Sequence, residues 1–271
     1  MTPAASANAR LFHQLHAHGL LLLANAWDAG SARLIESVGA KAIATTSAAV
    51  AWSHGYEDGD YLPVPLLEAT VADITRLIRV PLSVDFEGGY ADEPAAVGEN
   101  VARIIGAGAV GINLEDGTGS PDLLCAKIEQ VRRAAARLGV DLFVNARTDT
   151  YLRNTIPAER RVEETLVRAE RYRAAGANGI FVPGLVDATA IRTIASAVKL
   201  PLNVLARTGL PAAAELAALG VRRLSAGAGL AEIMYGRIAS LAADFLRTGV
   251  SAPLIDGAMP YHDINALMAV S

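Results

Sequence analysis

The sequence is short of cysteine, of aromatic residues and of long apolar runs, and each shortage excludes a class of protein. A single cysteine, Cys125, in 271 residues excludes an internal disulfide and is typical of a reducing compartment. The N-terminus lacks the basic segment and apolar core of a signal peptide, and the apolar run 20–24 is far too short to cross a bilayer. We therefore expect a cytoplasmic protein with no membrane partner.

Charge and aromatic content narrow the functional classes further. The formal net charge is −4, and the arginine pairs at 132–133 and 160–161 are scattered rather than gathered into a basic stripe, so we expect no nucleic-acid partner. With 5% aromatic residues, the chain offers few platforms for binding a carbohydrate. Apolar residues make up 52%, which ensures a sizeable core, and the prevalence of Ala, Leu, Val and Ile suits helices packed on parallel strands.

Short apolar runs alternate with amphipathic helical stretches from one end of the chain to the other. Each run is followed by a predicted helix, and a repeat of about 30 residues matches one βα unit of a (β/α)₈ TIM-type barrel. We predict a single barrel domain over residues 1–271, in which 249–271 form a C-terminal tail with one short helical piece. The eight predicted strands are 20–24, 42–45, 82–85, 111–115, 142–146, 179–182, 202–205 and 223–227.

A doubly wound open sheet would give a similar alternation. It usually carries a glycine-rich phosphate turn after its first strand, whereas this chain has N-A-W-D-A-G there, with no G-x-G-x-x-G. Asp28 in that turn stands where a helix N-cap belongs. After the second strand we expect a long loop over 46–64, and we expect the histidines at 13, 16 and 18 to be solvated at the opposite end of the barrel from the site.

Two of the predicted strands end in acids followed by glycine. V-D-F-E-G-G-Y brings Asp85 and Glu87 to the end of one strand, and I-N-L-E-D-G brings Glu115 and Asp116 to the end of the next. Like charges in a weakly solvated place repel one another unless a cation offsets them. Oxygen ligands without His or Cys beside them suit Mg²⁺ or Mn²⁺ rather than zinc. We predict that Asp85, Glu87 and Glu115 face one metal ion at the barrel mouth.

Residues suited to binding an anion follow neighbouring strands. Arg147 comes directly after the fifth predicted strand and can pair with a carboxylate through its forked guanidinium. The backbone amides and hydroxyls of Thr46, Ser47 and Ala48 offer an anion cradle after the second strand. Asn203 lies inside an apolar strand, where a buried structural amide and a substrate contact both stay open. Together these groups predict a small carboxylate substrate held on the metal.

Five motifs resemble the isocitrate lyase/phosphoenolpyruvate mutase superfamily, and the likeness covers nearly the whole chain. They are N-A-W-D-x-x-S-A-R-L after the first strand, S-A-A-V-A-W-S-x-G-Y-x-D-G after the second, V-D-x-E at the third, N-L-E-D-G at the fourth and N-A-R-T-D at the fifth. The resemblance implies a (β/α)₈ barrel that uses Mg²⁺. It also implies a homo-oligomer, a dimer or tetramer, in which the C-terminal helical extension is exchanged between subunits.

The resemblance assigns roles to individual acids. Asp85 matches the direct metal ligand of the superfamily, and Glu87 and Glu115 match acids that hold the metal, often through water. Asp58 matches the acid on the loop after the second strand.

The resemblance also assigns substrate contacts. Thr46, Ser47 and Ala48 match the segment that binds the substrate carboxylate or phosphonate through its backbone, and Arg147 matches the substrate-binding arginine.

One departure from the superfamily bears on the reaction. Isocitrate and methylisocitrate lyases carry K-[KR]-C-G-H in the gating loop after the fourth strand, with the cysteine as proton donor. Here the loop 117–122 reads G-T-G-S-P-D, without lysine, cysteine or histidine, and Cys125 falls in the following helix, where we expect it to pack. The chain therefore resembles the shorter-loop members, among them oxaloacetate decarboxylases and 2-methylisocitrate lyase-like proteins.

The leading hypothesis is a Mg²⁺-dependent lyase that cleaves a C–C bond of a small 2-oxo or 2-hydroxy carboxylic acid through a metal-stabilised enolate. The missing cysteine favours decarboxylation, in which water protonates the enolate. A retro-aldol reaction would need a base, for which Asp58 and Glu115 are candidates. The alternatives are phosphonopyruvate hydrolase or phosphoenolpyruvate mutase-type C–P chemistry, and a non-catalytic 2-oxo acid binding protein.

Overall fold

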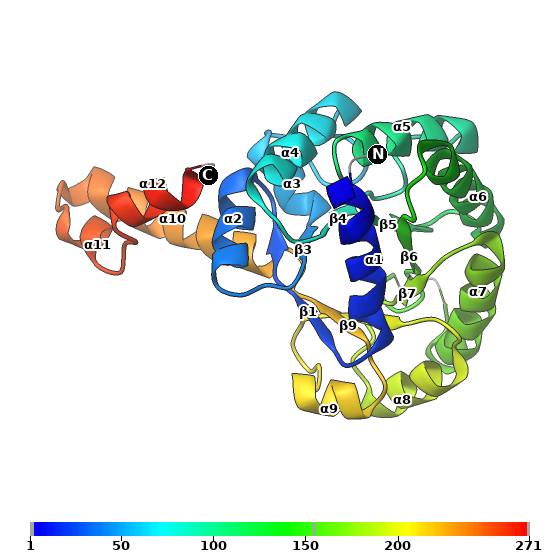
Figure 1. Ribbon diagram of the computed structural model, residues 1–271. Coiled ribbons are helices and arrows are strands. Elements are labelled where there is room, and N and C mark those ends of the chain that lie inside the picture. Colours follow the sequence, from blue (N-terminus) through cyan, green and yellow to red (C-terminus); the bar gives the residue numbers. More distant parts are fainter. Residues whose placement is uncertain (1–2, 154–155, 270–271) are drawn as a thin grey trace.

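Nine parallel strands form one sheet that curls into a nearly closed barrel (Figure 1). The computed structural model describes residues 3–153 and 156–269. The strands follow the order β1-β9-β8-β7-β6-β5-β4-β3-β2, and only Ala24 separates β1 from β2. The two edges of the sheet therefore meet in one chain segment, so that β1 and β2 are two pieces of the predicted first strand. The predicted α/β barrel is confirmed.

All the predicted strands are present, with ends within two residues of those expected. Their bounds are β1 Leu21–Leu23, β2 Asn25–Ala26, β3 Ile43–Thr45, β4 Leu82–Asp85, β5 Gly111–Glu115, β6 Phe143–Arg147, β7 Gly179–Phe181, β8 Leu202–Leu205 and β9 Arg223–Ser225.

Helices surround the barrel, and none in the described part of the chain has the length and hydropathy needed to span a bilayer. Asp28 caps α2 as predicted, because its carboxylate accepts from the amide of Ser31 at 2.6 Å. The helices are α1 Pro3–Ala17, α2 Ala29–Ser37, α3 Ser47–Ser53, α4 Val64–Leu77, α5 Pro94–Gly106, α6 Pro121–Leu138, α7 Arg161–Ala175, α8 Ala188–Ala197, α9 Ala213–Ala218, α10 Gly229–Thr248, α11 Ala252–Ile255 and α12 Tyr261–Met268, with a 3₁₀ turn at Ala158–Arg160.

Two sequence predictions about loops were wrong. The expected loop 46–64 begins with the helix α3, since its first half is rich in alanine and buries Val50 and Ala51, while the glycines lie only in its second half. The tail 249–271 contains two helices, α11 and α12, rather than one short helical piece. α12 returns to α2, where the Arg33 side chain donates to the Leu267 carbonyl at 3.1 Å.

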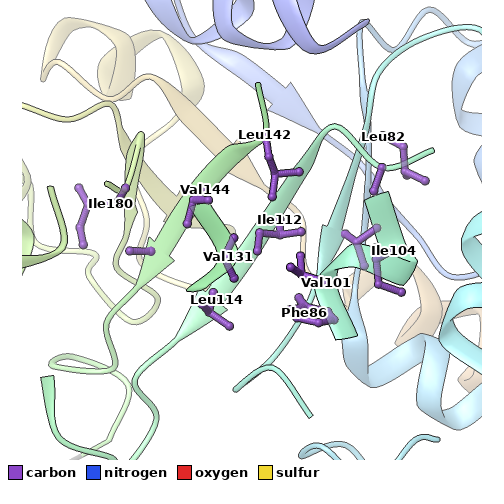
Figure 2. Packing of buried hydrophobic residues seen from close by; sticks show 14 of the residues in the cluster. Leu82, Phe86, Val101, Ile104, Ile112, Leu114, Val131, Leu142, Val144 and Ile180 are labelled. Atoms are coloured by element: carbon purple, nitrogen blue, oxygen red, sulfur yellow. The ribbon is translucent and has the colours of Figure 1, made fainter. Parts of the chain in front are cut away.

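Side chains alternate between the two faces of each strand, and this alternation separates the hydrophobic core from the site. On β5, Ile112 and Leu114 point outward and pack with Val101 of α5 and Val131 of α6 (Figure 2). The intervening residue, Asn113, is a buried amide that contacts the side chains of other strands. Asp85, Asn113 and Asn145 are register partners on β4, β5 and β6, which places polar groups in a row inside the barrel.

The N-terminal helix α1, which the sequence did not predict, packs at the bottom of the barrel. Phe12 and His16 contact Phe143 of β6, with ring centroids 5.4 Å and 4.0 Å away. His16 is buried, contrary to the expectation that it is solvated, and its Nδ1 donates to the Phe12 carbonyl at 2.8 Å. Burial, together with the charge of Arg223, lowers the pKa of His16 to about 3.

His16 should therefore make the protein sensitive to acid. The unfolded state binds a proton below pH 6.5 and the folded state only near pH 3, so stability is complete above 6.5 and falls as the pH drops through this window. At pH 5 the loss is about 2 kcal/mol. Urea unfolding midpoints measured from pH 7 to pH 4.5 should fall less steeply in His16→Phe than in the wild type. The exposed His18→Gln is the control, and equal slopes in all three proteins would refute this role of His16.

Candidate functional site

The carboxyl ends of β3 to β6 bring the predicted acids and the predicted arginine to one end of the barrel. Asp85 ends β4, Glu115 ends β5 and Arg147 ends β6, with Glu115 and Arg147 as register partners. The carboxylates share one electrostatic field, because both Asp85 and Glu87 raise the pKa of Glu115. The structure therefore places the predicted residues at the expected rim.

Asp85 is held on both of its oxygens. Its Oδ2 accepts from the amide of Ser47 at 3.1 Å, and its Oδ1 accepts from the Asn113 side chain at 3.2 Å. Its own amide donates to the hydroxyl of Thr45 at 2.8 Å. Two neighbouring strands, β3 and β5, and the start of α3 thus fix the position of Asp85, which is the requirement for a preorganised ligand.

Glu87 is buried and sits in a strained backbone conformation. Its φ of 48° lies in the left-handed region that non-glycine residues rarely adopt, as do those of Asp60 and Tyr90. Its carboxylate accepts from the amides of Gly59 and Asp60 and from the Tyr90 hydroxyl, the last at 2.7 Å. Desolvation raises the pKa of Glu87 to about 7. Such strain persists only where surrounding contacts enforce it, and it gathers at functional sites.

Arg147 joins two acids at the end of β6. Its Nη1 lies 2.5 Å from Glu115, and its Nε and Nη2 donate to the two oxygens of Asp149 at 2.8 and 3.1 Å. Burial lowers the pKa of Arg147, but the charges of Glu115 and Asp149 raise it by more. The pKa of Arg147 therefore lies above its ordinary value. Burial also raises the pKa of Glu115 to about 8, and the contact with Arg147 opposes that shift.

The segment predicted to bind the substrate carboxylate lies at the start of α3. The amide of Ser47 donates to Asp85, and the amide of Thr46 donates to the Ala26 carbonyl at 3.0 Å. In this structure, two amides of the segment that ends at Ala48 are therefore engaged by protein groups.

Asp58 lies beside this segment and accepts from the Ser47 hydroxyl at 3.0 Å. Desolvation of its carboxyl raises the pKa of Asp58, and the charge of Asp85 adds to the rise. The pairing links the loop acid to the start of α3.

Asn203 is enclosed within the barrel. Its side chain exchanges hydrogen bonds with the Ser225 hydroxyl at 3.3 Å, and only 1% of the residue is exposed. These contacts favour the structural reading of Asn203 over the substrate contact, the two readings that the sequence left open.

Asp116, the residue after Glu115, is a buried junction rather than a ligand at the rim. It accepts from the hydroxyl of Thr148 at 2.8 Å, the amide of Asp149 at 3.0 Å, the guanidinium of Arg168 at 2.8 Å and the hydroxyl of Tyr172 at 2.6 Å. These bonds tie the end of β6 to α7 and so position the residues beside Arg147. The sequence marked Asp116 only as an acid at a strand end, and Tyr172 lies too far along the chain to be linked to it.

A cavity of about 290 Å³ opens between the loops that follow β4 and β5. Glu87 and Glu115 line it, together with Lys127 and Arg153 and the short loop 117–120. Lys127 is buried, and its Nζ donates to the Gly88 carbonyl at 2.6 Å. The cavity combines acidic and basic walls beside the acid cluster.

The donor set fits a divalent cation in chemistry, although the acids do not close around one point. Over residues 3–153 and 156–269, no three His, Cys, Asp or Glu side chains are spaced to hold a metal ion. Glu87 is turned to the amides around Gly59, and Glu115 to Arg147. Burial is the main cause of the raised pKa values of Glu87 and Glu115, and neighbouring carboxylates add to both shifts; a bound cation would stabilise the charged forms. The assignment of a metal to Asp85, Glu87 and Glu115 stays a prediction.

Comparisons with known proteins cover most of the chain. The profile of the phosphoenolpyruvate phosphomutase family matches residues 12–246. An uncharacterised protein of Mycobacterium tuberculosis H37Rv is 35% identical over 94% of this chain and 95% of its own length. Oxaloacetate decarboxylase of Paraburkholderia xenovorans is 31% identical over 80% of this chain and 74% of its own. The crystal structure of a presumed phosphonomutase from Burkholderia cenocepacia J2315 is 42% identical, with a TM-score of 0.83, over 87% of this chain and 99% of that one.

The Asp116 junction should contribute measurably to stability. Tyr172→Phe removes one donor from a buried carboxylate and should lower the free energy of unfolding by about 1–3 kcal/mol. The matched control is Tyr61→Phe, whose side chain is exposed and should leave the unfolding midpoint unchanged. Chemical denaturation of the two variants measures the difference. Equal midpoints would show that the other three donors suffice for Asp116.

Proposed function

The chain belongs to the phosphoenolpyruvate phosphomutase family, within the isocitrate lyase/phosphoenolpyruvate mutase superfamily, and on this basis we propose that it is a Mg²⁺- or Mn²⁺-dependent lyase. Its substrate is a small 2-oxo carboxylic acid, of which it cleaves a carbon–carbon bond. The observation that carries the proposal is the placement of Asp85, fixed on both oxygens, beside the Arg147–Glu115 ion pair at the carboxyl end of the barrel.

Asp85 would hold the metal directly, and Glu87 and Glu115 would hold it through water. A bound Mg²⁺ would supply Lewis-acid chemistry that stabilises negative charge developing on the substrate. Arg147 would bind a substrate carboxylate through its forked donors, for which the substrate competes with Glu115 and Asp149. The start of α3, from Thr46 to Ala48, lies beside Asp85 and would bound the substrate on the other side.

Decarboxylation is the version that the chain supports best. When CO₂ leaves, the electron pair of the broken bond passes to an enolate, which takes a proton at carbon to give the 2-oxo acid product. The loop 117–120 contributes no acid to this step, so water supplies the proton. The retro-aldol version needs a base to take the hydroxyl proton, for which Asp58 and Glu115, both with raised pKa values, are the candidates.

A second candidate is C–P chemistry on a phosphonopyruvate-like acid. It is favoured by the 42% identity to the presumed phosphonomutase. Arg147 suits a phosphonate as well as a carboxylate, because its donors match either pair of oxygens. Phosphate release from phosphonopyruvate separates this candidate from the decarboxylase, and binding of 2-oxo acids without turnover would identify a binding protein instead.

The decarboxylase proposal predicts pyruvate formation from oxaloacetate that depends on Mg²⁺ and on Asp85. Asp85→Asn should lower the rate, corrected for the metal-only reaction, by about 100-fold or more, because the neutral amide is a poor ligand for a hard cation. Asp73→Asn, an exposed position on α4, is the control and should keep the wild-type rate. A wild-type protein no faster than Mg²⁺ alone would rule the decarboxylase out.

We also propose a homo-oligomer built through α10–α12. α10 and α11 extend away from the barrel, whereas α12 returns to α2 (Figure 1), and α10 carries the exposed Ile233 and Ile238. On the barrel, Leu22 of β1 faces outward with 55% of the residue exposed, although parallel strands are normally covered by a helix. It lines a groove of about 450 Å³ between α1, β1 and α2. The helices of a second copy would cover this uncovered face, giving a dimer or tetramer.

Charges on α10 should therefore dissociate the assembly. Ile233→Glu combined with Ile238→Glu places two carboxylates on the apolar face and should shift the sedimentation coefficient to that of a monomer. Val167→Glu on α7, where the side chain is also exposed and lies away from the groove, should leave the assembly intact. A wild-type protein that sediments as a monomer at micromolar concentration would contradict the proposal.

A further inference from the structure

An arginine is fully buried in the centre of the barrel, below the site. Arg223 lies on β9 with 1% of the residue exposed, and its side chain crosses the barrel to reach β5. Its Nε donates to the Ser225 hydroxyl at 3.2 Å, and its Nη2 donates to Oδ1 of Asn113 at 3.3 Å. Its Nη1 has no hydrogen-bond partner among the described residues, and the guanidinium forms none of the ion pairs found there.

A buried guanidinium without a carboxylate in contact is unfavourable for the fold. Burial lowers the pKa of Arg223 to about 10, and the charge that opposes this shift is that of Asp85. A methionine or leucine would fill a similar volume without this cost, and replacing buried charges by apolar residues often stabilises proteins. The arginine therefore destabilises the barrel unless it serves the residues above it.

Arg223 is connected to Asp85 through the side-chain amide of Asn113. Oδ1 of Asn113 accepts from Arg223 and also from the side chain of Asn145 at 2.9 Å. Its Nδ2 donates to Oδ1 of Asp85 at 3.2 Å. An arginine side chain has donors and no acceptor, so only the side-chain oxygen of Asn113 can face Arg223. The amide group must then face Asp85, whose carboxylate can only accept.

We propose that Arg223 is a positioning residue for the metal site: it fixes the orientation of the Asn113 amide, which in turn fixes the carboxylate of Asp85. The inference rests on the proposed function, because it concerns the acid assigned to the metal. It adds a residue from β9, 110 positions from Asn113 in the chain, that none of the five motifs contains. Partners in this outer position typically change metal affinity by about 10–100-fold.

The test is a double-mutant cycle on the affinity for Mn²⁺, measured by electron paramagnetic resonance on the protein without substrate. Arg223→Met keeps the length of the side chain and removes its donors, and should raise the Kd for Mn²⁺ by about tenfold. Asn113→Ala should raise it at least as much. In the Asn113→Ala background, Arg223→Met should add less than about threefold, since its effect passes through the missing amide.

A control variant separates positioning from general loss of stability. Arg132→Met removes a half-buried guanidinium, which donates to the carbonyls of Gly176 and Leu142 between α6 and its neighbours. It should leave the Kd for Mn²⁺ unchanged. Arg223→Lys retains a donor-only cation and should recover part of the affinity, and it replaces Arg223→Met in the cycle if the methionine variant does not fold.

The outcomes separate this inference from the proposed function. A wild-type protein that binds no Mn²⁺ refutes the metal site itself. Wild-type binding with additive effects of the Arg223 and Asn113 substitutions overturns the positioning role. Unchanged or tighter binding in Arg223→Met also overturns it, because the arginine would then act only as a charge that repels the ion.

Discussion

Repulsion between carboxylates at the barrel mouth is the constraint around which the site is built. Asp85, Glu87 and Glu115 end or follow adjacent parallel strands, so the fold itself drives them together. Each is anchored differently: Asp85 by an amide and a backbone N–H, Glu87 by a strained loop, and Glu115 by Arg147. Burial is the main cause of the raised pKa values of the two glutamates, and neighbouring carboxylates add to it, so the charged forms lack a group that would stabilise them fully. A divalent cation is the simplest group that would.

Behind these acids lies a polar interior that is unusual for a small barrel, where apolar side chains normally fill the centre. Asn113, Asn145, Asn203 and Arg223 occupy it, and all are almost completely buried. Their hydrogen bonds connect β5, β6, β8 and β9, and they lead upward to Asp85. Lower down, α1 closes the barrel with Phe12 and His16. The barrel interior is therefore polar from its centre up to the site, and the ring side chains of α1 close it from below.

The sequence predicted the barrel and the rim residues because both follow from local patterns. An apolar run predicts a strand, and the residue that ends the run is predicted to lie at the rim of the barrel. Asp85 and Arg147 were found in this way. Contacts between distant segments leave no such pattern. Arg223 stands in an apolar strand without sign of its partner Asn113, and Tyr172 looks like an ordinary helix residue until α7 packs against Asp116. The helix α3 was missed because the glycines that follow it dominate the composition of the segment.

The most direct test of the account is a crystal of the protein grown with Mn²⁺ and examined by anomalous scattering. One strong anomalous peak should lie beside the carboxylate of Asp85, with Glu87 and Glu115 also turned toward the ion. A map with no peak at Asp85, or with its peak at another group of acids, would contradict the central claim that these three carboxylates serve one ion.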